Sequence, residues 1–201
     1  ISQTALDCQP QPEVTLQLKK IIQSVDRSSH VVQQLMNMSK TMPEALQLSN
    51  FKSINLKPLV QDILSQMAPF ALEREMEMEF DAVNALPSIH GNKIALEILV
   101  RNLVDNAIRY SYPKTTIYIN LYTIDETLVL EVRDQGPGIP KNKQDKVFDR
   151  FFRAHDPKYQ GSGLGLAIVK QIAHLHQAQI TLESSFEDKG MIIRVFFPIN
   201  T

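Results

Sequence analysis

The stretch "RNLVDNAIRY", residues 101–110, places two asparagines four positions apart within an apolar helical pattern. On a helix, Asn102 and Asn106 project from the same side and can share one ligand. Asparagine is a poor helix former because its amide competes for backbone hydrogen bonds, so this pair weakens the helix unless something uses the amide oxygens. A hard cation such as Mg2+ is one candidate. Amides that face solvent or cap a neighbouring segment are the alternative.

The composition restricts the class of protein. With 201 residues, of which 43% are hydrophobic and 21% charged, the chain can bury a core and form one or two globular domains. No apolar run approaches the ~20 residues that span a bilayer, and the first residues lack the order of a signal peptide. We therefore expect a cytoplasmic fragment without direct membrane contact, whose transmembrane part, if one exists, lies outside this chain.

Charge and cysteine content exclude further classes. The 21 Lys and Arg residues nearly balance the 22 Asp and Glu residues, so overall electrostatics do not suggest a nucleic-acid partner. The single cysteine, Cys8, excludes an internal disulfide and a zinc-finger pattern, which fits a reducing compartment.

The segment from about residue 13 to residue 45 predicts one long helix. It contains no glycine, and no proline before Pro43, and its heptad seam is mostly apolar, as in a helical bundle. The apolar seam residues are Leu18, Ile21, Val25, Val32, Leu35 and Met42. We favour a homodimer through this seam over docking onto the chain's own globular part. Residues 1–50 are thus assigned to part of a helical hairpin, and residues 51–201 to a second domain.

Beyond a polar connection at about residues 49–53, the pattern alternates between helix and strand. Apolar spacing predicts helices over 54–75, 92–110 and 163–176, with Asn55 as the cap of the first. Alternating runs predict strands over 76–80, 115–125, 127–134, 179–185 and 190–199, of which the second and third form an antiparallel hairpin. Helices on one side of a mainly antiparallel sheet make an α+β two-layer domain.

Five of the seven glycines fall in two clusters, "DQGPGIP" (134–140) and "GSGLGL" (161–166). Gly163 and Gly165 open a helix, whose free N–H groups and positive dipole end favour phosphate. Asp134 follows a strand, where its carboxylate can accept a hydrogen bond from an exocyclic amine such as that of adenine. Gly136 and Gly138 let a flat base approach the backbone. A tight turn is the alternative for either cluster alone.

A basic segment with aromatic residues lies between the clusters. As a mobile lid it offers cations to a polyphosphate, and the alternative is a solvated basic loop anchored by its aromatics. Its basic and aromatic residues are Lys141, Lys143, Lys146, Arg150, Arg153 and Lys158 around Phe148, Phe151 and Phe152.

These motifs together resemble a known family. In chain order, Asn102 with Asn106, Asp134-x-Gly-x-Gly138, Phe148-x-x-Phe151-Phe152 and Gly161-x-Gly163-x-Gly165 resemble the N, G1, F and G2 boxes of two-component sensor histidine kinases. Any one box alone is a weak signal, but four in order are specific. The resemblance covers about residues 55–199. It implies an ATP-binding catalytic domain of the Bergerat type, a two-layer α/β sandwich whose mixed sheet is backed by helices.

The resemblance also implies roles for individual residues. Asn102 and Asn106 match the ligands of Mg2+ with the ATP phosphates. Arg109 and Tyr110 stand where the family has a Lys-Tyr pair near phosphate and sugar, and Asp134 matches the carboxylate that reads adenine. The remaining cofactor-binding residues that it implies are Gly136, Gly138, Ile139, Lys146, Phe151, Arg153, Gly161, Gly163, Leu164, Gly165 and Leu166.

One element of the family is absent from the sequence, namely the phosphoacceptor box of His, an acidic residue and then Arg-Thr-Pro. None of the histidines has these neighbours; they are His30, His90 before an expected turn, His155, His174 and His176. The acceptor is therefore expected upstream of this chain, and the fragment alone is expected not to phosphorylate itself. The resemblance further implies a response regulator receiver domain as partner and an inner-membrane sensor as parent protein.

Two alternative functions remain. ATPases of the related gyrase, chaperone and mismatch-repair type carry a water-activating glutamate at the position of Asn102, and an amide cannot act as that base. A non-enzymatic dimerising module with a degenerate nucleotide pocket is the other, and the intact glycines and Asp134 argue against it.

Overall fold

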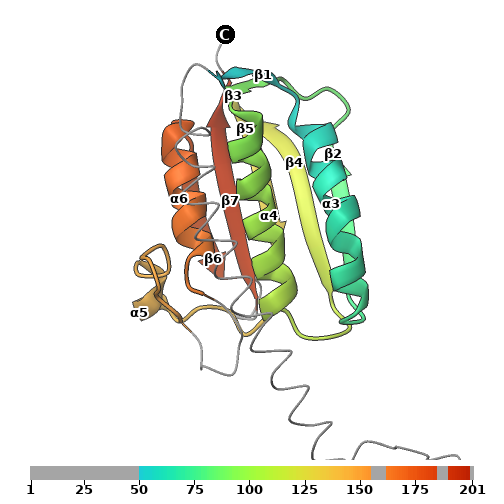
Figure 1. The fold of residues 1–201 in the computed structure, drawn as a ribbon, viewed down its shortest axis with the longest axis vertical. Coiled ribbons are helices and arrows are strands. Elements are labelled where there is room, and N and C mark those ends of the chain that lie inside the picture. The colour runs from blue at the N-terminus through green and yellow to red at the C-terminus, as the bar shows by residue number, and fades with distance from the viewer. Residues whose placement is uncertain (1–49, 155–161, 185–189, 200–201) are drawn as a thin grey trace, which may run out of the picture.

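The computed structural model describes residues 50–154, 162–184 and 190–199. In chain order the elements are β1 (Lys52–Ile54), α3 (Leu56–Leu72), β2 (Glu77–Ala82), β3 (Ile89–Gly91), α4 (Lys93–Tyr110), β4 (Thr116–Ile124), β5 (Thr127–Arg133), α5 (Lys141–Gln144), α6 (Gly165–Leu175), β6 (Gln179–Ser184) and β7 (Met191–Pro198). Helices α3, α4 and α6 lie side by side on one face of a five-stranded sheet (Figure 1). The predicted dimerisation helix lies outside the described residues, so it stays a prediction.

The five-stranded sheet has the order β2-β4-β5-β7-β6. Strands β2 and β4 run parallel, whereas the other neighbouring pairs in this sheet are antiparallel. The β4–β5 pair is the hairpin predicted from the sequence, with Ile124 opposite Thr127 beside its turn. The fold is therefore the predicted α+β sandwich with a mixed, mainly antiparallel sheet.

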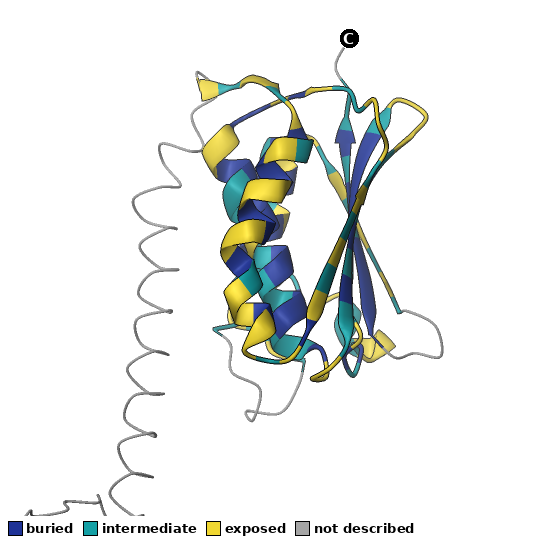
Figure 2. Ribbon diagram, turned by 90° about the vertical axis from the view of Figure 1, so that its right-hand side faces the viewer, coloured by how far each residue is buried: buried dark blue, intermediate teal, exposed yellow. Residues whose placement is uncertain are grey.

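The core lies between the helices and the sheet face that they cover. Strand alternation brings Leu121, Leu130 and Val195 next to one another across β4, β5 and β7, where each is at most 1% exposed. From the other layer, α4 contributes Leu99 and Leu103, which are equally buried. Figure 2 shows the exposed positions of the helices on the side turned away from the sheet. Because each fully buried aliphatic side chain contributes about 1.5–3 kcal/mol, this contact fixes α4 against the sheet.

Asparagine caps determine where two helices begin. Asn55 Oδ1 accepts a hydrogen bond from the Lys57 N–H at 3.0 Å, which confirms the predicted cap of α3. Asn92 Oδ1 accepts one from the Ala95 N–H at 3.1 Å and caps α4. Replacing such a cap by alanine costs about 1 kcal/mol. The cap at Asn92 therefore helps to fix the helix that carries the asparagine pair.

Two short strands differ from the sequence prediction. The connection predicted at about residues 49–53 contains most of β1, and His90, expected just before a turn, lies within β3 and pairs with Ser53. These strands form a separate two-stranded antiparallel sheet. Three residues are too few to show the alternation on which strand prediction rests. Of the helices in the described ranges, none has both the length and the apolar character that a membrane span requires.

Candidate functional site

A cavity opens at the C-terminal end of α4, where this helix meets the beginning of α6 and the loop after β5. It measures about 910 Å³, counting the space open to solvent at its mouth. The predicted binding residues that line it are Asn106, Arg109, Tyr110, Asp134, Gly138, Ile139, Arg153, Gly163, Gly165 and Leu166. Phe152 from the predicted F box also lines it. All four sequence motifs thus reach one cavity.

The remaining predicted binding residues lie elsewhere. Asn102, Gly136, Lys146, Phe151 and Leu164 do not line the cavity, and Gly161 lies outside the described residues. Leu164 belongs to the hydrophobic core, where it is 1% exposed. Phe151 is 66% exposed, so of the adjacent phenylalanines it is Phe152 that contributes to the wall.

The two amides of α4 meet the first residue of α6. Asn102 Nδ2 donates to the carbonyl oxygen of Ile98 at 2.8 Å, which leaves its Oδ1 directed toward α6. A Cβ added to Gly165 would lie 3.2 Å from Asn102 Oδ1 and 3.3 Å from the Asn106 amide. Asn106 makes no hydrogen bond with any described residue. An amide oxygen is therefore available for a ligand beside the N-terminus of an 11-residue helix.

Asp134 is held in place by the start of β7. Its backbone N–H donates to Met191 O at 2.9 Å. Its Oδ1 accepts from the Gly136 N–H at 2.8 Å and from the Met191 N–H at 3.2 Å. Burial raises the pKa of this carboxyl group from 3.8 to about 6, and the two backbone hydrogen bonds oppose that rise. Oδ2 has no partner among the described residues and can accept a hydrogen bond from a ligand.

Close backbone contacts shape the loop that follows Asp134. A Cβ at Gly136 would lie 2.5 Å from Tyr110 O, and one at Gly190 would lie 2.1 Å from Asp134 O. Gly190 also has a φ of +79°, which L side chains rarely adopt, and its N–H donates to Gly136 O at 2.7 Å. Gly190 therefore allows the start of β7 to support the loop that carries the carboxylate.

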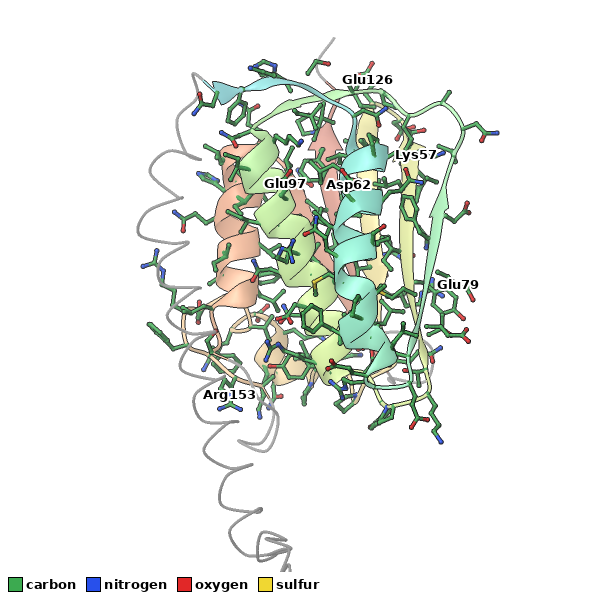
Figure 3. All side chains as sticks on the ribbon, turned by 45° about the vertical axis from the view of Figure 1, so that its right-hand side comes forward. Lys57, Asp62, Glu79, Glu97, Glu126 and Arg153 are labelled. Atoms are coloured by element: carbon green, nitrogen blue, oxygen red, sulfur yellow. The ribbon has the colours of Figure 1, made fainter. Side chains whose placement is uncertain are left out.

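Cationic side chains also line the cavity. Arg109 Nε lies 2.7 Å from Asp105 Oδ2, one helical turn earlier, and both residues line the wall. Burial raises the pKa of the Tyr110 phenol, whereas the nearby Arg153 and Arg109 lower it. Figure 3 shows Arg153 at the end of the domain opposite Glu126. The cavity thus combines the Asp134 carboxylate, and the Asp105 carboxylate that pairs with Arg109, with two guanidinium groups. A ligand with both a base and an anionic part suits such a set.

Sequence reasoning missed several residues of this site. Asp105 lies four positions before Arg109, a spacing typical of helical ion pairs, so its signal was present in the sequence. Gly190 was an isolated glycine at the first position of a predicted strand, where close backbone approach is common. Met191 and Ser162 also line the cavity, and the strand pattern gave no sign that Met191 holds Asp134.

The described histidines lie away from the cavity. His176 is 5% exposed, and its Nε2 accepts from the Asn92 N–H at 3.0 Å. Its Nδ1 therefore carries the proton and donates to Ile172 O at 2.8 Å. His90 and His174 are exposed, and none of the histidines that the structure describes lines the cavity.

Comparison with known proteins agrees with this arrangement. The family model described as "Histidine kinase-, DNA gyrase B-, and HSP90-like ATPase" matches residues 91–201. The chain is 35% identical over 182 residues to the sensor protein kinase PmrB of Pseudomonas aeruginosa, which covers 90% of this chain and 38% of PmrB. It spans between about a third and a half of the length of the curated relatives that it matches.

Solved structures give the same fold. The mycobacterial sensor histidine kinase MprB matches with a TM-score of 0.64 and 30% identity, covering 74% of this chain and 97% of that structure. The histidine kinase AdeS of Acinetobacter baumannii matches with a TM-score of 0.70, covering 96% of this chain and 87% of that structure. At 24% identity, the likeness to AdeS concerns the fold alone.

Proposed function

Since this chain belongs to the histidine kinase-, DNA gyrase B- and HSP90-like ATPase family, we propose that it is the ATP-binding catalytic region of a sensor histidine kinase. It transfers the γ-phosphoryl group of ATP to a histidine on another segment, for relay to a response regulator. No histidine of this sequence has the acceptor motif. The acceptor is therefore proposed to lie upstream of this chain.

One observation carries the proposal: two acceptors without protein partners line one cavity. Asp134 Oδ2 and the Asn106 amide oxygen have no partners among the described residues, and both residues line a cavity that is open to solvent, so a ligand can reach them. A carboxylate suits the amine of adenine, and an amide oxygen suits a hard cation. A nucleotide with its metal ion would satisfy both.

The residues present fit Mg2+–ATP. Among the described residues no three His, Cys, Asp or Glu side chains gather into a metal site, and Mg2+ commonly binds through few protein oxygens together with substrate phosphates. Asn106, assisted by Asn102, would hold the ion. The first N–H groups of α6, with Arg109 and Arg153, would hold the phosphates. Bound Mg2+ supplies charge neutralisation on the phosphates.

The chain's own residues would orient the nucleotide and exclude water from the cavity. Asp134 fixes the base, the beginning of α6 orients the phosphates, and Phe152 with Ile139 shields the cavity. The ATPase alternative needs a base that takes a proton from water, and the amides cannot supply it. Asp105 lines the cavity but is engaged by Arg109 at 2.7 Å. These observations favour transfer over hydrolysis.

The partners follow from the same proposal. A response regulator receiver domain would receive the phosphoryl group, and the seam in residues 13–45 would form the homodimer. The parent protein would be an inner-membrane sensor with this region in the cytoplasm. Light scattering of the 201-residue chain tests the dimer, and a monomer at high concentration would contradict it.

Calorimetric titration with Mg2+–ATP tests the proposed site. Asp134→Ala is expected to weaken binding by about 1–3 kcal/mol, because it removes the partner of the base and leaves polar groups unpaired. Asp62→Ala is the matched control, since Asp62 is an exposed aspartate on α3 (Figure 3). Equal affinity of both variants would reject the site, and a chain that does not bind ATP would support the degenerate-module alternative.

Labelled ATP tests the reaction. The chain alone is expected to bind ATP without acquiring acid-labile label, because no histidine of the described residues lines the cavity. Adding a separate acceptor hairpin with the family's His box should produce acid-labile label on that hairpin. Acid-labile label on a histidine of this chain would contradict the proposal and identify that residue as the acceptor.

A further inference from the structure

Arg74 lies in the turn between α3 and β2 and reaches the C-terminal end of α4. Its Nη1 donates to Ile108 O at 2.5 Å and to Arg109 O at 2.9 Å. Its Nη2 donates to Ser111 O at 3.3 Å. The last carbonyls of a helix lack partners within the helix, and a cation there also lies at the negative end of the helix dipole. Arg74 therefore holds the end of α4 from a segment 34 residues earlier.

The part of α4 that Arg74 holds is the part that lines the cavity. Its last turns carry Asp105, Asn106, Arg109 and Tyr110, all of which line the wall. These side chains project from one rigid helical segment, so a small displacement of its end moves them together. Arg74 does not itself line the cavity.

The same end of α4 supports the loop after β5. Tyr110 O would lie 2.5 Å from a Cβ at Gly136, which places the helix end against this loop. Ser111 Oγ accepts from the Gln135 N–H at 3.4 Å, and the Tyr112 N–H donates to Gln135 O at 3.2 Å. Two hydrogen bonds to Gln135 therefore join the end of α4 to this loop.

We propose that Arg74 is a positioning residue of the nucleotide site. By fixing three carbonyls at the end of α4, it sets the position of the Asn106 and Arg109 side chains. It also sets the surface on which the loop after Asp134 rests. The inference rests on the proposed function, because the site that Arg74 positions is the proposed nucleotide site.

A second arginine gives a matched control. Arg101 also joins α3 and α4, since its Nη1 lies 3.6 Å from Met67 Sδ and its Nη2 donates to Gln66 Oε1. Neither contact involves a helix-end carbonyl, and Arg101 does not line the cavity. If bridging the two helices were all that mattered, loss of either arginine would affect the site alike.

The test uses the 201-residue chain with Arg74→Met, Arg74→Lys and Arg101→Met, and methionine preserves much of the alkyl stem. Titration with Mg2+–ATP should give a Kd raised roughly tenfold for Arg74→Met, because charge-assisted hydrogen bonds to the helix end are lost. Arg74→Lys should recover part of the affinity, since an ammonium group still donates to carbonyls but lacks the fork. Arg101→Met should stay within about twofold of wild type.

Hydrogen–deuterium exchange of the nucleotide-free protein gives an independent readout. Arg74→Met should raise exchange in peptides from residues 105–112 and 134–139. Peptides from residues 89–96 and 172–178, at the other end of α4 and α6, should not change. Local opening of this kind is what loss of a helix-end anchor produces.

Two results would overturn the inference. One is an Arg74→Met Kd within about twofold of wild type, and the other is a rise in exchange spread evenly over the chain, which would mean general destabilisation. If the wild type fails to bind Mg2+–ATP, the proposed function fails. The exchange pattern then still decides whether Arg74 positions the two segments.

Discussion

The two ends of the α4–α6 helix pair use similar residues but differ in how completely their polar groups are hydrogen-bonded. At the beginning of α4, Asn92 caps the helix and also donates its N–H to His176 Nε2, while His176 Nδ1 donates to Ile172 O. We call this the closed end. At the other end, Asn106 and Asp134 Oδ2 have no partners among the described residues. We call this the open end.

The comparison shows which feature marks a ligand site. Both ends have a glycine in close contact with a side chain: a Cβ at Gly91 would lie 2.8 Å from the His176 ring, and one at Gly165 would lie 3.2 Å from Asn102 Oδ1. Close approach at a glycine therefore occurs with and without a ligand. What distinguishes the open end is that the Asn106 and Asp134 acceptors lack protein donors and line a cavity that a ligand can enter.

Asp134→Asn should give the largest effect on nucleotide affinity. If affinity did not fall, the distinction between the open and closed ends would be wrong. We expect Mg2+–ATP affinity to fall on the order of a hundredfold, because an amide NH2 can take the place of the acceptor that faces the base. The nucleotide-free protein should instead become more stable. A pKa raised to about 6 means that the ionised carboxylate at pH 7 opposes folding by at most roughly 3 kcal/mol.

Because Asp134 is only partly buried, we expect a smaller gain, on the order of 1–2 kcal/mol. Thermal unfolding at pH 7 without nucleotide measures it, and the exposed Asp62→Asn serves as control. A variant that loses both affinity and stability would mean that Asp134 acts as an ordinary structural residue.

His176→Ala tests the closed end. It removes the ring that stacks on Phe51 at 4.9 Å and leaves the Asn92 N–H without its acceptor. We therefore expect a loss of about 2 kcal/mol in the free energy of unfolding. Nucleotide affinity should be unchanged at a temperature where the protein stays folded. Denaturant unfolding and calorimetry measure the two quantities, with the exposed His174→Ala as control. Loss of affinity equal to that of Asp134→Asn would erase the distinction between the ends.

The substitutions Gly91→Ala and Gly165→Ala compare the two ends directly, with smaller expected changes in stability and affinity. Alanine at 91 meets the packed His176 ring, so we expect about 1 kcal/mol of destabilisation and unchanged binding. Alanine at 165 favours the helix by up to about 1 kcal/mol but pushes on the two amides. Affinity should then fall severalfold with little change in stability. The same calorimetric and unfolding measurements apply, and a stability loss confined to Gly165→Ala would reverse the assignment of the ends.

The long elements and the motif residues could be predicted from the sequence because their signals are local. Periodicity of 3.6 and 2 residues gave α4 and the β4–β5 hairpin, and the Asn55 cap depends on a residue two positions away. Asp134 ends a predicted strand, so its place at the edge of the sheet could be predicted from the sequence.

The contacts that complete the site are not local. Met191 holds Asp134 from 57 residues away, and Arg74 reaches α4 from 34 residues away, so no sequence window contains both partners. The basic segment between the glycine clusters adds a related case, because Lys146 and Phe151, whose predicted binding roles stay predictions, do not line the cavity in the structure. Which side of a loop faces a ligand depends on its packing and not on its composition.

The pH dependence of stability should give the smallest effect, with opposite signs at the two ends. Burial lowers the pKa of His176, opposed by its bond to Ile172, so its contribution is complete above pH 6.5 and is lost as the pH falls toward its folded-state pKa. Asp134 behaves in the opposite way, because its pKa is raised to about 6 and protonation between pH 7 and 5 relieves the cost of burying its charge.

The stability advantage of Asp134→Asn over wild type should therefore shrink between pH 7.5 and 5.5, by roughly 0.5–1 kcal/mol. Replacing His176 by Gln should remove part of the wild-type loss over the same interval, since glutamine does not titrate. Urea unfolding of the three proteins at both pH values, without nucleotide, measures these differences. An advantage of Asp134→Asn that grows as the pH falls would mean that the carboxylate is stabilised in the folded state, and the open end would then need no ligand to explain it.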